Sequence, residues 1–177
     1  MAPIINAPEP RRIFAAALLI AAACNPALAN AAWTTRERVS GDPPGSLPIA
    51  AVTQHSRALE VQLDGQGDAW LQFNIAPSDP AFASSQCPTF QIDQQLQLIH
   101  FSIGESCVVT AASAKVKLGH RTDPGVLSPA LYALVNGNRI AVRYITHERR
   151  YREVSFSLRH AKRAVRKALG GRQIRSR

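Results

Sequence analysis

Apolar and polar residues alternate at every second position through much of the C-terminal half of the chain. One such run covers 140–145 and a second covers 153–158, with the polar link 147–150 between them. Successive side chains of a strand point to opposite faces, so each run presents one apolar face. The two runs therefore predict an antiparallel hairpin with one face on a core.

A second hairpin is predicted earlier in the chain. Apolar residues alternate with polar ones over 59–63 and again over 71–75, and the turn sequence Gly-Gln-Gly-Asp at 65–68 separates the two runs. This combination is typical of paired strands. Shorter or less regular β patterns cover 90–92, 96–103, 108–112 and 115–118.

Two segments have helical signals instead. From Leu158 to Leu169 the apolar residues fall on one side of a helical wheel and the cations on the other, which predicts an amphipathic helix ending at Gly170-Gly171. Its apolar side is mostly alanine, which favours packing on a sheet over insertion into a membrane interface. Ser128-Pro129 is a typical helix start and predicts a short helix over 131–135. The Asn-Gly pair that follows can also close a hairpin.

These elements predict a mainly β domain with no internal repeat. The expected fold is a single antiparallel β-sandwich or partly open barrel, with one short helix and a C-terminal amphipathic helix packed on it. The expected domain covers 52–170. A flexible lead-in at 30–51, rich in Pro, Gly and polar residues, precedes it, and a mobile basic tail at 171–177 follows it.

The first 29 residues have the pattern of a secretory signal peptide. Arg11 and Arg12 precede a short apolar run at 13–23, and the sequence Ala-Leu-Ala ends at Ala29, the expected cleavage site. The run is too short to span a bilayer. Export by the general or the twin-arginine route stays open, with the general route favoured. Cys24 lacks the preceding Leu of a lipoprotein site and is expected to leave with the leader. The protein is thus expected in the bacterial periplasm or secreted.

Removal of the leader leaves Cys87 and Cys107, an even pair in an exported chain. Such a pair predicts a disulfide. The alternatives are two buried thiols or a redox pair, and the lack of a C-x-x-C motif disfavours the redox pair. Without His or carboxylate at ligand spacing, the two cysteines make a poor zinc site.

Charge is unevenly distributed along the chain. Residues 30–138 hold six Lys or Arg against nine acids, whereas 139–177 hold thirteen against two. A basic surface at one end attracts anionic partners. The candidate partner-binding residues are Arg149, Arg150, Arg152, Arg159, Lys162, Arg163, Arg166 and Lys167. The alternative interpretation is a solvated face that keeps the protein soluble.

Catalytic and cofactor motifs are missing from the sequence. The five histidines are scattered, and there is no H-E-x-x-H, G-x-S-x-G or P-loop. We therefore expect no enzyme activity, no metal and no cofactor. An envelope hydrolase would need a cleft with converging polar groups.

The C-terminal third resembles two groups of exported proteins. The pattern Leu131-x-x-Leu134-x-Asn136-Gly137-x-Arg139-Ile140-x-Val142, followed by Phe156-Ser157-Leu158 and a helix with Ala164 and Ala168-Leu169, is similar to the ends of invasion-associated locus B proteins and of VasI-type type VI secretion accessory proteins. The Gly that often follows Ser-Leu there is replaced by Arg159. The resemblance implies a small exported β-rich domain with a packed terminal helix and carries over no functional residues.

Two functional hypotheses follow. The first is a non-enzymatic periplasmic or secreted protein that uses its basic C-terminal face to bind an anionic envelope component, either a lipid head group or an acidic polymer, with no nucleic acid expected. The second is a secretion-accessory or inhibitor-type module that binds another protein through the loop between Cys87 and Cys107.

Overall fold

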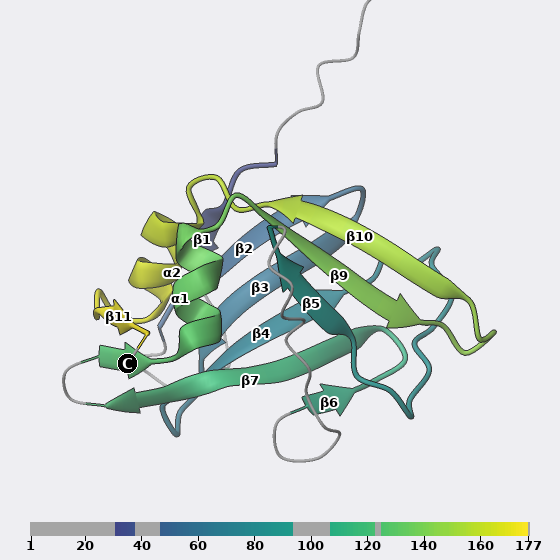
Figure 1. The fold of residues 1–177 in the computed structure, drawn as a ribbon, viewed down its shortest axis with the longest axis horizontal. Coiled ribbons are helices and arrows are strands. Elements are labelled where there is room, and N and C mark those ends of the chain that lie inside the picture. Colours follow the sequence, from purple (N-terminus) through teal and green to yellow (C-terminus); the bar gives the residue numbers. More distant parts are fainter. Residues whose placement is uncertain (1–30, 38–46, 94–106, 123–124, 177) are drawn as a thin grey trace, which may run out of the picture.

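The computed structural model describes residues 31–37, 47–93, 107–122 and 125–176, which form two β-sheets and two helices (Figure 1). The large sheet contains β1 (Thr34–Arg36), β2 (Ile49–Gln54), β3 (Arg57–Leu63), β4 (Asp68–Asn74), β6 (Cys107–Val109), β7 (Ser113–Thr122), β8 (Gly125–Leu127) and β11 (Ile174–Arg175). The small sheet contains β5 (Thr89–Ile92), β9 (Arg139–Ile145) and β10 (Tyr151–Ser157). The helices are α1 (Pro129–Asn136) and α2 (Ala161–Ala168).

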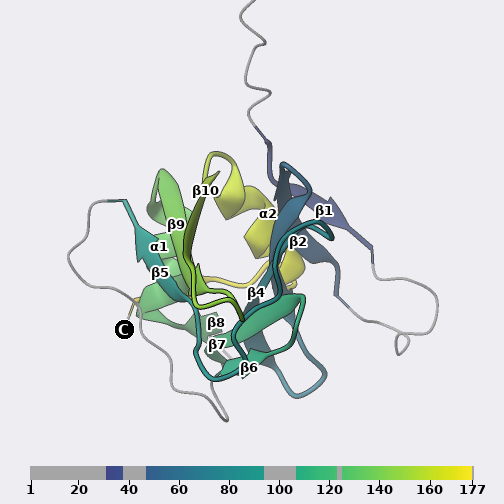
Figure 2. The same ribbon diagram turned by 90° about the vertical axis from the view of Figure 1, so that its right-hand side faces the viewer.

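The large sheet curls into a half-barrel, and the small sheet lies across its open side (Figure 2). Strands β1 to β4 pair antiparallel in chain order, and β7 then pairs with β4. Strands β6 and β8 share the other edge of β7, and β11 pairs parallel with β8. In the small sheet β9 lies between β10 and β5. The predicted fold class, a β-sandwich or partly open barrel with two helices, is confirmed.

Aromatic side chains from both sheets meet at the centre of the core. Phe73 on β4 is fully buried, and its ring centroid lies 5.8 Å from that of Phe82, 5.4 Å from that of Tyr144 and 6.0 Å from that of Phe156. These distances suit edge-on aromatic packing. The alternation in the sequence thus placed Phe73, Tyr144 and Phe156 on inward faces, as predicted.

The helices cover the remaining part of the core. The hydroxyl of Ser128 accepts a hydrogen bond from the Leu131 N–H at 3.0 Å, so α1 begins as the sequence predicts. Helix α2 packs on β1, β2 and β3, and it begins at Ala161, three residues later than expected, because 158–160 form a turn. Gly170 and Gly171 have φ of +71° and +75° and end α2, where the Gly171 N–H donates to the Arg166 carbonyl.

The predicted lead-in and tail both contribute strands. Trp33 is buried, its ring N–H donates to the Ser157 carbonyl at 2.8 Å, and β1 pairs with β2. This corrects the expectation of a loose stretch for 33–36 and 49–51. At the other end, β11 pairs with β8. This pairing needs a glycine at position 125, because a Cβ added there would lie only 2.2 Å from the backbone oxygen of Gln173. This corrects the expectation of an unstructured tail for Ile174–Arg175, which form a paired strand.

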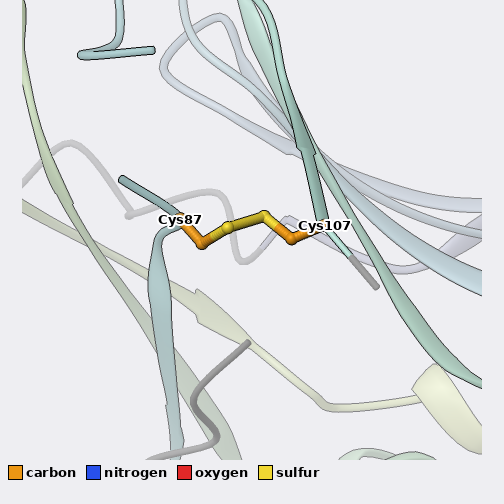
Figure 3. The surroundings of a disulfide bond; sticks show 2 residues. All are labelled: Cys87 and Cys107. Atoms are coloured by element: carbon orange, nitrogen blue, oxygen red, sulfur yellow. A yellow bond between two sulfur atoms is a disulfide. The ribbon is translucent and has the colours of Figure 1, made fainter. Parts of the chain in front are cut away.

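Cys87 and Cys107 form a disulfide, as predicted (Figure 3). Cys87 lies just before β5 of the small sheet, and Cys107 begins β6 of the large sheet. The bond therefore joins the two sheets covalently. The predicted leader at 1–29 and the predicted strand at 96–103 lie outside the described residues.

Candidate functional site

The basic face of α2 is the strongest candidate for a binding surface. Its four cations, Lys162, Arg163, Arg166 and Lys167, are all exposed, and Arg159 is exposed in the turn before the helix. The opposite face of α2 is buried on the sheet through Ala161, Ala164, Val165 and Ala168. Because a row of small residues holds the helix close to the sheet, the direction of the basic face is set by packing.

The cations of α2 have no acidic partner in the part of the chain that the structure describes. There the ion pairs join Arg36 with Glu60, Arg57 with Asp79, Lys117 and His120 with Asp68, Arg143 with Glu153, and Arg150 with Glu148. The Lys162 ammonium donates to the Asn136 amide oxygen at 3.0 Å, a neutral partner. Within the described residues, no carboxylate therefore pairs with the positive charges of α2.

A groove runs between α2 and the edge strand β1. It has a volume of about 440 Å³ and is lined by Trp33, Thr34 and Thr35 on one side, with α2 and the residue before it on the other. The lining residues on the α2 side are His160, Arg163, Ala164 and Lys167. Sequence reasoning missed this groove, because β1 was assigned to the lead-in.

The other predicted basic residues lie elsewhere. Arg149 and Arg150 are exposed in the β9–β10 turn and Arg152 near the start of β10, whereas α2 follows the other end of β10 (Figure 1). Strand β10 has seven residues, which separates the two groups by roughly 20 Å at about 3.3 Å per residue. The expected single basic face is thus divided into an α2 group and a turn group. Arg149 also lines a second groove, of about 570 Å³, with residues 82–86, Ile145 and His147.

One charged cluster was not foreseen from the sequence. Asp68 is 7% exposed. One of its carboxylate oxygens lies 2.7 Å from the Lys117 ammonium nitrogen, and the other lies 2.7 Å from the His120 Nδ1. Lys117, and then His120, hold the pKa of Asp68 below its ordinary value through these hydrogen bonds. The residues are separated by 49 and 52 positions, so only the pairing of β4 with β7 reveals the cluster.

The Asp68–His120 pair has the geometry of the acid and base of a hydrolytic triad. A triad also needs a nucleophile bonded to the second ring nitrogen of the histidine. No hydroxyl or thiol among the described residues makes that hydrogen bond. We therefore interpret the pair as a side-chain contact that connects β4 to β7. Lys117, on the same strand as His120, adds a second such contact.

We expect Asp68→Asn to destabilise the protein at pH 7 by about 1 kcal/mol, because two hydrogen bonds of the carboxylate are weakened while both partners, Lys117 and His120, stay partly exposed. A lowered pKa in the folded state stabilises the fold above the unfolded value, near pH 4, and this contribution is lost as the pH falls through the folded value. The difference between wild type and variant should therefore shrink below about pH 4. Urea unfolding of both proteins at pH 7 and pH 3 measures this difference in unfolding free energy.

Glu148→Gln is the matched control for this prediction. Glu148 is exposed and its carboxylate lies 3.4 Å from the Arg150 guanidinium, so its removal should change stability little at either pH. A difference between wild type and Asp68→Asn that stays constant from pH 7 to pH 3 would contradict the structural link described above.

The described residues contain neither a metal-binding cluster nor a membrane-spanning helix. No three His, Cys, Asp or Glu side chains gather there as they would around a metal ion. Nor does either helix reach the length and apolar character needed to cross a bilayer. Comparisons of the chain with known family models, with curated proteins and with solved structures give no match, so its resemblance to the two exported families stays a prediction.

Proposed function

We propose that the protein is an exported, non-enzymatic binding protein that contacts an anionic component of the cell envelope through the basic face of α2. The observation that supports this most is the set of exposed α2 cations with no acidic partner among the described residues. Export itself rests on the leader pattern of the sequence. The disulfide suits an oxidising compartment.

The geometry favours binding at a surface over insertion into one. The apolar side of α2 is already buried on the sheet, so it cannot also enter a bilayer. The large apolar side chains that are exposed in the described part, Val108, Leu127, Tyr132 and Tyr151, lie outside α2. Contact through α2 is therefore electrostatic, and each cation near anionic lipid contributes about 1 kcal/mol, which salt reduces.

We expect the triple variant Arg163→Glu, Arg166→Glu and Lys167→Glu to bind vesicles of anionic lipid at least about thirtyfold more weakly at low salt, because three attractive charges become repulsive. Vesicle co-sedimentation at low and high salt measures the loss. The matched control is Arg149→Glu, Arg150→Glu and Arg152→Glu, which makes the same charge change at the β9–β10 turn.

The control variant should retain most of the binding. If the α2 variant binds like the wild type, or if both variants lose binding equally, α2 is not the contact surface. Capture of a stoichiometric protein partner from envelope extract at high salt, unaffected by the α2 variant, would favour the protein-binding alternative instead.

A further inference from the structure

The cations of α2 divide into two rows with different surroundings. Arg163 and Lys167 are four residues apart, which places them along one side of the helix, and His160 lies in the turn just before it. All three line the groove beside β1. Lys162 and Arg166 form the second row, and the bond from Lys162 to Asn136 places that row on the α1 side.

The groove offers several donors at once to a bound anion. Arg163 and Lys167 are permanent cations, and neither makes an ion pair with any described residue. Thr35 contributes a hydroxyl that makes no hydrogen bond to the described residues, and His160 contributes an imidazole. A guanidinium, an ammonium and a hydroxyl therefore belong to residues that line one groove of about 440 Å³, and these are the donor types that bind the oxygens of a small tetrahedral anion.

The charge of the groove distinguishes between anions. Two permanent cations balance a group with two negative charges better than a group with one. A phosphate monoester carries about −1.5 to −2 at pH 7, whereas a carboxylate or a phosphate diester carries about −1. The planar fork of an arginine side chain also binds phosphate oxygens in pairs.

The walls of the groove are held without a ligand. On one side β1 pairs with β2 over Thr34–Arg36, and the indole of Trp33 is tied to the Ser157 carbonyl. On the other side Ala164 is 5% exposed and anchors the middle of α2 on the sheet. Binding a ligand therefore requires little ordering of the backbone, which favours affinity.

We propose that the groove between β1 and α2 binds a phosphate monoester group. This inference rests on the proposed function, because it assigns the chemistry that the α2 surface selects within the envelope. The ester has two possible sources, a lipid head group and a soluble phosphate ester. Both present the same terminal phosphate to Arg163 and Lys167.

Two double variants with equal charge change test the inference. Arg163→Gln with Lys167→Gln removes the cations of the groove, and Lys162→Gln with Arg166→Gln removes those of the α1 side. Calorimetric titration with glycerol 1-phosphate should show binding to the wild type and to the α1-side variant. The groove variant should bind at least about tenfold more weakly, because it lacks two cations worth about 1 kcal/mol each.

Vesicles distinguish the two sources. Vesicles with phosphatidic acid, a monoester, are compared with vesicles of phosphatidylglycerol, a diester, at matched surface charge. A preference for phosphatidic acid that only the groove variant loses supports the inference with lipid as the source. Binding of glycerol 1-phosphate that depends on the groove, without preference between vesicles, supports it with a soluble ester as the source.

Two results would overturn the inference. If the two double variants weaken every interaction equally, the groove has no role of its own, although the proposed contact through α2 stands. If the wild type binds no glycerol 1-phosphate and shows no preference for phosphatidic acid, the groove does not select monoesters. Failure to bind any anionic vesicle would refute the proposed lipid contact as well.

Discussion

Replacement of Phe73 with alanine is expected to lower the free energy of unfolding by about 3–5 kcal/mol. Phe73 is 0% exposed, and its ring contacts those of Phe82, Tyr144 and Phe156. Truncation removes the apolar area that these contacts bury and leaves a cavity, because partners on three separate segments cannot all collapse into it. This loss is a large share of the stability of a domain of this size.

Urea-induced unfolding of the purified protein measures the effect. Tyr151→Ala is the matched control, since it also truncates an aromatic ring but at a site that is 61% exposed. Its effect should stay within about 0.5 kcal/mol. A loss of less than about 1.5 kcal/mol for Phe73→Ala would mean that the two sheets do not meet at this ring.

Loss of the disulfide is expected to have the second-largest effect, about 3 kcal/mol. Cys87 and Cys107 are separated by 20 positions in the sequence. The bond closes this segment into a loop in the unfolded chain and so removes conformational freedom that folding would otherwise cost. Since it also joins the small sheet to the large one, its loss should loosen the attachment of β5.

The double variant Cys87→Ser and Cys107→Ser tests this expectation by urea unfolding with and without a thiol reductant. Reductant should destabilise the wild type by nearly as much as the double substitution does. It should leave the double variant unchanged, which is the control. Equal stability of the wild type with and without reductant, when mass analysis shows both thiols free, would contradict the prediction.

Local patterns in the sequence predicted most of the elements of the fold. The alternation over 59–75 and 140–158 corresponds to the β3–β4 and β9–β10 hairpins. Ser128 marked the start of α1, and the paired glycines after Leu169 marked the end of α2. These signals are visible in sequence because each depends on residues only a few positions apart.

The misjudged parts of the fold are short elements held by distant partners. Strand β1 has three residues and β11 has two, which is too few for a periodic pattern. The first depends on pairing with β2 and on the bond from Trp33 to Ser157, 124 positions away. The second depends on the close approach that Gly125 permits. The sequence near each element contains no sign of these contacts.

The candidate site likewise combines features that the sequence predicts with features that only the fold creates. The sequence by itself determined which residues carry the positive charge and that α2 has one apolar and one basic side, because composition and helical period are local properties. Only the tertiary structure decided that Arg149, Arg150 and Arg152 lie far from α2, and that Arg163 and Lys167 face a groove beside β1. Those relations come from the length of β10 and the pairing of β1 with β2. Such long-range packing depends on the whole chain at once, so no local pattern encodes it.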